Sequence, residues 1–342
     1  MRDVYKSAVT GSPRCWCLET RLCFAQVVAE KISIMKGMSF INSIVVSGGT
    51  HGNERTGVFL VKKWMEHPAC YENLCKGARV ELVLANPEAV RLNRRYFDFD
   101  MNRAFSQTCL DASVEPQQYE FRRARELNRL YGPKGPATKT DLLLDIHNTG
   151  ANMGFCLILS ARDPFTMRAS AVLTQEFENA WIYYQPEERP ASPYFGTVAK
   201  ADVCIEIGPQ QHGTLDARIF ETSERLVKRY LELADEWNRG ELQKRKPIPV
   251  KVFTQLRDLG YPKTWAGAPI TAMIHPNLKG RDYVELEKGE PIFRTFDGKD
   301  ILYEGEPGLP ADAAVCPIFI DEPAYYEKDI AMSLTVRTQE MW

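Results

Sequence analysis

The chain has no long apolar run and almost no net charge, and each shortage excludes a class of protein. No run of apolar residues approaches the roughly 20 that a helix needs to span a bilayer, so any membrane association would be peripheral. The formal net charge is −2 over 342 residues, which provides no basic field for nucleic acid. With 44% hydrophobic residues, the chain is long enough for one large core or two domains. The composition is that of a soluble globular protein without internal repeats.

The sequence also lacks a disulfide framework. Its nine cysteines are an odd number and are scattered along the chain. Cys15, Cys17 and Cys23 lie close together but lack a second pair of ligands for a structural metal. Cys156 and Cys204 lie inside apolar runs, where we expect them to be small core residues. The pattern indicates reduced thiols, as in the cytosol.

Histidine is scarce, with five in the chain, and two of them stand in an informative context. Apolar runs typical of buried strands cover residues 44–47, 142–146 and 203–207. His51, His147 and Glu206 fall at or near the C-terminal ends of these runs. In an open α/β sheet this edge is where binding sites form. The three polar side chains are therefore predicted to meet at one edge of a sheet.

These residue types indicate a zinc site. A catalytic zinc takes three protein ligands and one water, and two histidines with one carboxylate are a known set, which His51, Glu54 and His147 would supply. Glu206 then remains for proton transfer. A single histidine at a strand end is more often structural, so the hypothesis depends on the two together. The other three histidines are interpreted as surface or structural residues: His67, His212 and His275.

Five motifs occur in a fixed order: G-G-T-H-G-N-E, R-Y-x-D-x-D-x-N-R, D-x-H-N-T-x-x-N-M-G, I-E-I-G-P-Q and A-Y-Y-E-K. Their order resembles the aspartoacylase and aminoacylase-3 family, a branch of the zinc-carboxypeptidase-like hydrolases. The resemblance spans roughly residues 41–331. It implies one zinc per subunit and a homo-oligomer in the cytosol, with peripheral association at the apical plasma membrane as an additional expectation.

The resemblance also implies roles for the motif residues. His51, Glu54 and His147 would bind zinc, Glu206 would act as general base and then as general acid, and Arg95 would polarise the scissile carbonyl. Elementary chemistry agrees, because zinc lowers the pKa of bound water from about 16 to about 7. A permanently charged guanidinium can stabilise the oxyanion of the tetrahedral intermediate.

Substrate contacts are expected from the same motifs. Asn102 and Arg103 would hold the α-carboxylate, since a guanidinium pairs with it bidentately. Asn148 and Thr149 are expected to contact the substrate, and Tyr325 matches a family tyrosine that reaches the site from the second domain. Two alternatives stay open. Arg94, Arg95 and Arg103 could form a solvated basic stretch, and Tyr325 and Tyr326 could be an aromatic pair packed between domains.

One departure from the family bears on selectivity. Aspartoacylase carries an arginine for the aspartate side chain just before a segment that matches residues 197–200, and Gly196 stands in its place here. An unpaired, desolvated carboxylate is costly, so an acidic side chain should be disfavoured. Tyr194 and Phe195 would line a pocket for apolar or aromatic side chains, unless Arg189 reaches inward instead.

We therefore expect an amidohydrolase that removes the acetyl group from small N-acyl amino acids. N-acetyl aromatic amino acids and N-acetylcysteine S-conjugates, the mercapturic acids, are the expected substrates. The alternatives are an aspartoacylase that cleaves N-acetyl-L-aspartate, a zinc carboxypeptidase, and a binding protein that has lost catalysis.

The expected fold is α/β, a mixed sheet flanked by helices, with a smaller C-terminal β-rich domain. We predict an N-terminal extension at 1–40, a zinc-hydrolase domain at 41–243 and a β-rich domain at 244–342 that covers the cleft. Apolar runs predict further strands at 80–85, 155–159, 181–184, 250–254, 270–274, 291–296, 301–303 and 315–320. Helices are predicted at 56–66, 119–131 and 215–237.

Overall fold

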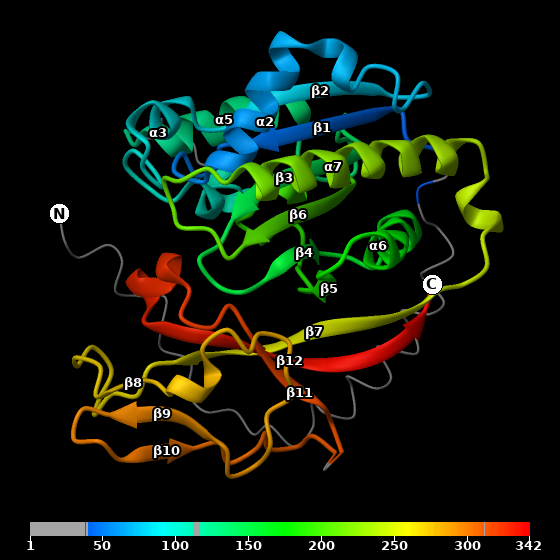
Figure 1. The fold of residues 1–342 in the computed structure, drawn as a ribbon. Coiled ribbons are helices and arrows are strands. Elements are labelled where there is room, and N and C mark those ends of the chain that lie inside the picture. Colours follow the sequence, from blue (N-terminus) through cyan, green and yellow to red (C-terminus); the bar gives the residue numbers. More distant parts are fainter. Residues whose placement is uncertain (1–37, 39, 112–116, 311) are drawn as a thin grey trace.

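The computed structural model describes residues 38, 40–111, 117–310 and 312–342. In Figure 1 a large sheet runs from the top of the view into its lower half, with helices on its faces in the upper part, and a smaller sheet lies at the bottom. The predicted fold class is confirmed: a mixed α/β sheet flanked by helices and a C-terminal β-rich part. The predicted extension at 1–40, with Cys15, Cys17 and Cys23, lies almost wholly outside the described residues.

The large sheet has nine strands in the order β11-β12-β7-β5-β4-β6-β3-β1-β2. Four neighbouring strands, β6, β3, β1 and β2, are parallel, and β4 joins β6 in the antiparallel direction. The strands of this part are β1 (Ser43–Gly48), β2 (Arg79–Leu84), β3 (Leu142–Asn148), β4 (Gly154–Leu159), β5 (Ala180–Tyr184) and β6 (Ala201–Gly208).

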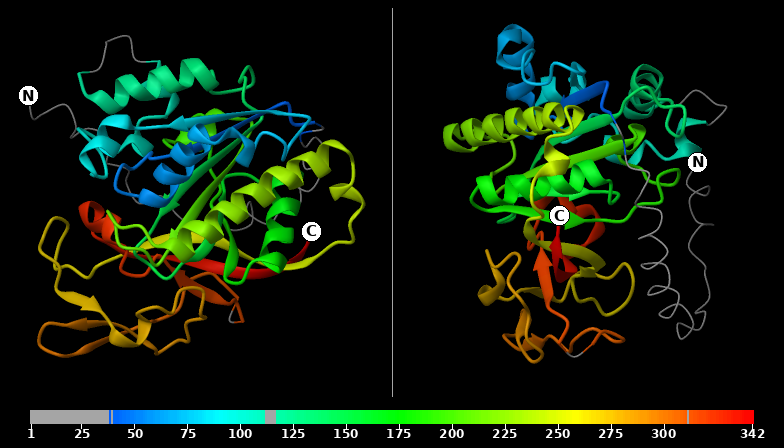
Figure 2. Two further views of the ribbon diagram at one scale, coloured as in Figure 1. Left: turned by 45° about the horizontal axis from the view of Figure 1, so that its top comes forward. Right: turned by 90° about the vertical axis from the view of Figure 1, so that its right-hand side faces the viewer.

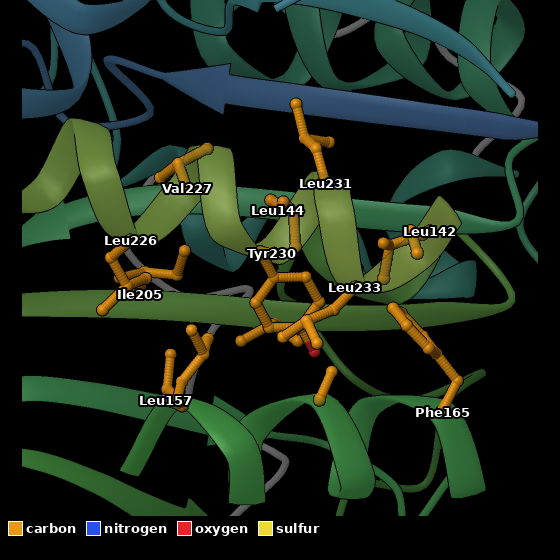
Figure 3. Packing of buried hydrophobic residues seen from close by; sticks show 14 of the residues in the cluster. Leu142, Leu144, Leu157, Phe165, Ile205, Leu226, Val227, Tyr230, Leu231 and Leu233 are labelled. Carbon is orange, nitrogen blue, oxygen red and sulfur yellow. The ribbon is translucent and has the colours of Figure 1, made fainter. Parts of the chain in front are cut away.

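Three helices cover one face of this sheet, and their apolar side chains form the main core with alternate strand residues. In Figure 3, Tyr230, Leu226 and Leu233 of α7 lie over Ile205 and Leu157 of the strands. The helices of this face are α2 (Arg55–Glu66), α6 (Pro164–Glu176) and α7 (Ala217–Asn238).

The opposite face is covered in two ways. Over β1 and β3, Val45 and Leu143 pack against Leu127 of α5 (Tyr119–Tyr131) and against Phe195. Over β6, β4 and β5, both polar and apolar side chains line a cavity, and the C-terminal part of the chain lies on its other side. The remaining helices, α3 (Pro87–Leu92) and α4 (Gln107–Leu110), lie in the connection between β2 and α5.

The C-terminal part is tied to the large sheet by two long strands. β7 (Pro249–Gly260) pairs in parallel with β5, and β12 (Ile330–Met341) pairs with β7 along its length. β11 (Val315–Ile318) completes that edge, whereas β8 (Ala272–Ile274), β9 (Pro291–Thr295) and β10 (Asp300–Leu302) form a separate sheet. Both views of Figure 2 place this small sheet at the far end from β1 and β2.

None of the helices in the described ranges is both long and apolar enough to cross a membrane. The six described cysteines are all free thiols: Cys70, Cys75, Cys109, Cys156, Cys204 and Cys316.

Candidate active site

The turn after β1 carries His51 and Glu54, and its glycines are required by the backbone. Gly49 has a φ of +73°, which side-chain-bearing residues rarely adopt. A Cβ on Gly52 would lie 2.0 Å from the carbonyl carbon of Ala89. The G-G-T-H-G sequence therefore allows a tight turn that leads directly into α2 at Arg55.

His51, Glu54 and His147 converge on one point. Nδ1 of His51 lies 2.7 Å from Oε1 of Glu54, Nδ1 of His147 lies 2.8 Å from Oε2 of Glu54, and the two Nδ1 atoms are 3.2 Å apart. All three side chains are buried. Bonds of about 2.0–2.1 Å to a tetrahedral ion would set such ligand atoms roughly 3.3 Å apart. Within the described residues, this is the group whose ligand atoms could hold a metal ion.

Each histidine is oriented by a carboxylate on its outer side. His51 Nε2 lies 3.1 Å from Asp100 Oδ1, and His147 Nε2 lies 2.8 Å from Asp145 Oδ2. Asp145 also accepts a hydrogen bond of 2.8 Å from Thr50 Oγ1. Metal-ligating histidines typically donate their other ring nitrogen in this way, which fixes the tautomer. The two Nδ1 atoms are thus left as inward-facing ligands, so the donor set fits a divalent ion such as zinc.

The electrostatics of the cluster are strongly coupled. Burial opposes ionisation of Glu54, but His51 and His147 outweigh burial and hold the pKa of Glu54 well below its ordinary value. Burial likewise opposes protonation of His147, but Asp145 and Glu54 raise its pKa well above the ordinary value. Glu54 and the histidines thus stabilise each other's charges at the point where they converge.

Glu206 lies beside the cluster, directly opposite His147 in the register of β6 and β3. Its Oε2 is buried and accepts no hydrogen bond from the described residues. Burial, reinforced by the negative charges of Glu54 and Glu322, raises the pKa of Glu206 to about 8. A buried, unpartnered carboxyl with a pKa near neutrality is suited to accept and return a proton.

Two arginines line the same cavity but differ in their partners. Arg95 donates to Glu54 at 3.1 Å and to Asp100 at 3.2 Å, so it is bound to the carboxylates of the cluster. Arg103 donates to the Asn102 carbonyl and lies 5.2 Å from the ring centroid of Tyr194. In the part of the chain that the structure describes, Arg103 makes no ion pair with a carboxylate.

The three predicted amide and hydroxyl contacts have partners within the protein. Asn102 lines the cavity, and its Oδ1 accepts a hydrogen bond of 3.0 Å from the Phe195 amide. Asn148 accepts from the Thr56 amide and donates to the Ile207 carbonyl, which ties α2 to β6. Asn148 and Thr149 are not among the residues that line the cavity.

Thr149 instead contacts the C-terminal part of the chain. Glu322 accepts hydrogen bonds from the Thr149 hydroxyl and from the Gly150 and Ala151 amides. Glu322 immediately precedes the 3₁₀ segment η7 (Pro323–Lys328), which carries Tyr325. This contact fixes that segment to the turn after β3, an arrangement that the sequence patterns did not indicate.

The C-terminal part provides one wall of the cavity. Tyr325 lines the cavity, and its ring centroid lies 5.7 Å from that of Phe319. Asp258 of β7 and Ser333 of β12 lie on the same wall and are hydrogen-bonded to each other at 2.7 Å. Lys328 also lines this wall.

The loop that carries Gly196 is held from behind by a buried lysine. Lys134 donates to the carbonyls of Phe105 and Ser192 and to the Thr197 hydroxyl. Burial, assisted by the nearby positive charge of Arg189, lowers the pKa of Lys134 to about 8. A buried amine with three oxygen acceptors orders the segment between residues 192 and 197.

Arg189 does not reach into the cavity. Its Nη1 donates to Asp202 at 2.7 Å and to Ser160 at 2.9 Å, and its Nη2 donates to the Ala199 carbonyl. Gly196 lines the cavity beside Asp202. Arg189 therefore supplies no free cation beside Gly196.

Comparisons with known proteins agree with this architecture. Residues 41–234 match the succinylglutamate desuccinylase/aspartoacylase catalytic domain, and residues 248–337 match the AstE/AspA barrel-sandwich hybrid domain. A probable aspartoacylase of Trichodesmium erythraeum is 39% identical over 300 residues, which cover 87% of this chain and 98% of that protein. The human N-acyl-aromatic-L-amino acid amidohydrolase (carboxylate-forming) is 38% identical over 305 residues, which cover 86% and 90%.

The crystal structure of murine aminoacylase 3 superimposes with a TM-score of 0.80 at 33% identity and covers 89% of this chain and 97% of that one. Relatives named aspartoacylase and relatives named N-acyl-aromatic-L-amino acid amidohydrolase are thus about equally similar to this chain. Overall sequence identity therefore does not decide the substrate. The comparisons do confirm the predicted family and the expectation of a hydrolytic enzyme. The chain belongs to the succinylglutamate desuccinylase/aspartoacylase family.

Proposed function

We propose that this protein is a zinc-dependent amidohydrolase that converts N-acyl L-amino acids to a carboxylate and the free amino acid. One observation carries the proposal: two histidine Nδ1 atoms and the Glu54 carboxylate converge on one point beside the unpartnered carboxyl of Glu206. A zinc ion at this point would supply Lewis-acid polarisation and a hydroxide-like nucleophile near neutral pH.

The surrounding side chains transfer the proton, stabilise the oxyanion and orient the histidines. Glu206 accepts the proton of the attacking water and returns it to the leaving amine, because its carboxyl lies beside the cluster without a hydrogen-bond partner among the described residues. Arg95 remains charged beside Glu54 and stabilises the developing oxyanion. His51 and His147 are kept in one tautomer by Asp100 and Asp145.

Arg103 is proposed to bind the α-carboxylate of the substrate. Its guanidinium is oriented by the Asn102 carbonyl and by the ring of Tyr194, but it has no protein carboxylate as partner among the described residues. An arginine in that state is available for a bidentate pair with the substrate. Asn102 supports this clamp indirectly through Phe195, and Tyr325 closes the cavity from the opposite wall.

We further propose a preference for N-acetyl aromatic amino acids and S-conjugated N-acetylcysteines over N-acetyl-L-aspartate. Gly196 offers no cation, and Arg189 is engaged by Asp202, Ser160 and Ala199. A substrate carboxylate at this end would lose its hydration without a counter-charge. Aspartoacylase activity is the second candidate, because relatives with that name are equally similar.

The test is amine release by zinc-loaded protein from N-acetyl-L-tyrosine and N-acetyl-L-aspartate at equal concentrations, with a chelated control. Chelator-sensitive preference for the tyrosine derivative supports both proposals. Preference for the aspartate derivative retains the zinc hydrolase but overturns the selectivity argument. Cleavage of peptide C-termini without cleavage of either derivative would favour the carboxypeptidase alternative, and zinc binding without any turnover would favour a binding protein.

Three remaining expectations derive from the family resemblance alone and are proposed on that basis. They are a homo-oligomeric assembly, a cytosolic location and peripheral association at the apical plasma membrane. Sedimentation velocity of the purified chain tests the first, and imaging of the tagged protein in polarised cells tests the other two.

A further inference from the structure

The floor of the cavity consists of alternate residues of neighbouring strands. Asp202, Cys204 and Glu206 of β6 all line the cavity, because alternate residues of a strand point to the same face. With a rise of about 3.3 Å per residue, Asp202 lies ~13 Å along the strand from Glu206. The cavity therefore extends from the proposed metal end toward Asp202.

The middle of this floor is apolar. Cys204 is paired with Ile158 of β4, and Ile158 is paired with Tyr183 of β5. All three line the cavity, and the rings of Phe319 and Tyr194 lie on its other walls. A substrate side chain that leaves the reaction centre would first pass between apolar and aromatic groups.

The far end of the floor is polar. One row beyond Ile158 and Tyr183 lie Ser160 and Gln185, next to Asp202. Glu187 also lines this end. From one end to the other, the cavity thus has a reaction centre, an apolar middle and a polar end.

Asp202 is the best placed of these polar groups to meet a ligand. Its Oδ1 accepts hydrogen bonds from Ser160 at 2.6 Å and from Arg189 at 2.7 Å, so the carboxylate is held in one orientation. No hydrogen bond to its Oδ2 is made by the described residues. The side chain is nearly buried, with 8% of its surface exposed, and it lines the cavity.

Gly196 and Asp202 depend on each other sterically. A Cβ on Gly196 would lie 2.7 Å from Asp202 Oδ2 and 3.0 Å from its Cβ. Where an arginine side chain would begin, this chain has a carboxylate instead. A side chain at position 196 and the Asp202 carboxylate would therefore occupy the same space, and in this chain the space holds a hydrogen-bond acceptor.

We infer that Asp202 is a specificity-determining residue that accepts a hydrogen bond from the tip of a long substrate side chain, and that the p-hydroxyphenyl group of an N-acyl tyrosine is the side chain it selects. This inference rests on the proposed function. The apolar middle fits the ring, and the acceptor fits the hydroxyl proton. Arg189 compensates the charge of Asp202, which favours a neutral donor over a cation.

The test compares two substrates that differ only at the tip: N-acetyl-L-tyrosine and N-acetyl-L-4-fluorophenylalanine. Sites built around a substrate hydroxyl reject analogues without it by up to about 10⁴–10⁵. We expect kcat/KM to favour the tyrosine derivative at least tenfold. A ratio near one in the unaltered protein would overturn the inference, and this comparison needs no variant that could fail to fold.

Two variants locate the effect. Asp202→Ala should bring the ratio close to one, whereas Asp258→Ala, which removes another carboxylate from the cavity wall, should leave the ratio unchanged. A ratio that persists in Asp202→Ala would contradict the assignment. Ser160→Ala, which removes one of the two donors to Oδ1, should reduce the ratio by less.

Calorimetric binding of the products L-tyrosine and L-4-fluorophenylalanine separates the inference from the proposed function. Tighter binding of L-tyrosine without hydrolysis of any N-acyl substrate would support Asp202 as the recognition group and refute the amidohydrolase. Hydrolysis of both N-acetyl derivatives, together with equal affinities for the two products, would support the amidohydrolase and overturn the role of Asp202.

Discussion

At the proposed metal end of the cavity, which His51, Glu54 and His147 form, each of the three side chains has at least two partners. At the far end, Asp202 Oδ2 has none among the described residues. Asp100, which fixes His51, belongs to the same sequence motif as Arg95. Asp145, which fixes His147, belongs to the same motif as that histidine. The far end is assembled from residues that belong to no shared motif: Ser160, Gln185, Glu187, Gly196 and Asp202. The contrast indicates that the chemistry is built into contiguous motifs, while selectivity depends on residues that can change one at a time.

The largest expected effect concerns the metal end. Glu206→Gln removes the proton acceptor but none of the three clustered side chains. We expect turnover of N-acetyl-L-tyrosine to fall by at least about 10²–10⁴ while the bound zinc is retained, because general acid–base catalysis is worth that much. Loss of zinc or near-normal turnover would contradict the role assigned to Glu206.

The next prediction concerns the far end. Gly196→Arg alone should be poorly tolerated, because its Cβ would collide with Asp202. The double change Gly196→Arg with Asp202→Gly provides the space and the cation together. We expect the double variant, but not the single one, to shift the ratio of kcat/KM toward N-acetyl-L-aspartate by at least tenfold. Equal ratios in both variants would show that the Gly196–Asp202 pair does not select the side chain.

A smaller effect is expected from the carboxylate behind His147. Asp145→Asn keeps the shape of the side chain but removes the charge that fixes the histidine tautomer. Such changes typically reduce metal affinity or activity 10–100-fold. Competition with a fluorescent zinc chelator measures the affinity, and Asp258→Asn serves as the matched control at a carboxylate outside the cluster. Equal zinc affinity in both variants would contradict this role for Asp145.

The raised pKa of Glu206 predicts the direction in which the stability of the metal-free protein changes with pH. Its pKa rises from an ordinary value to about 8 on folding, so the folded state binds the proton more tightly. The associated stability is fully present below the pKa of the unfolded state and is lost as the pH rises through about 8. In the presence of a chelator, urea unfolding should show a steeper loss of stability between pH 5 and 8 for the wild type than for Glu206→Gln. Parallel curves would contradict the assignment.

The smallest effect is expected at Lys134. Lys134→Met should loosen the segment between residues 192 and 197 without touching the metal end. We expect KM for N-acetyl-L-tyrosine to rise several-fold with little change in kcat. A fall in kcat at constant KM would show that the lysine supports the reaction centre instead.

The same contrast explains which features the sequence predicted. His51, His147 and Glu206 stand at the ends of apolar runs, and the strand periodicity therefore predicted their convergence. Asp100 and Asp145 stand in the motifs, but the sequence does not show that their carboxylates contact the histidine rings. That contact depends on how the rings are oriented in the fold. Asp202 is a polar residue in an apolar strand without a motif, and the sequence alone did not indicate its partners.

Four helices and strands of the fold were not predicted: the short helices α3 and α4, the longer helix α6 and the strand β12. The last two are long enough to ask why. β12 (Ile330–Met341) is buried on both faces in its first half and partly exposed in its second, so it lacks a regular alternation. α6 (Pro164–Glu176) is buried around most of its circumference by the sheet and α7, so it shows no clear polar stripe. In both cases tertiary packing, rather than local periodicity, determines the element.

Zinc content per chain, measured by mass spectrometry together with turnover in the same samples, tests the central claim most directly. The wild type is expected to retain one zinc per chain after dialysis and to cleave N-acetyl-L-tyrosine, whereas His147→Ala should lose both. Wild-type protein that hydrolyses the substrate without bound metal, or His147→Ala that retains stoichiometric zinc, would contradict a metal centre formed by His51, Glu54 and His147.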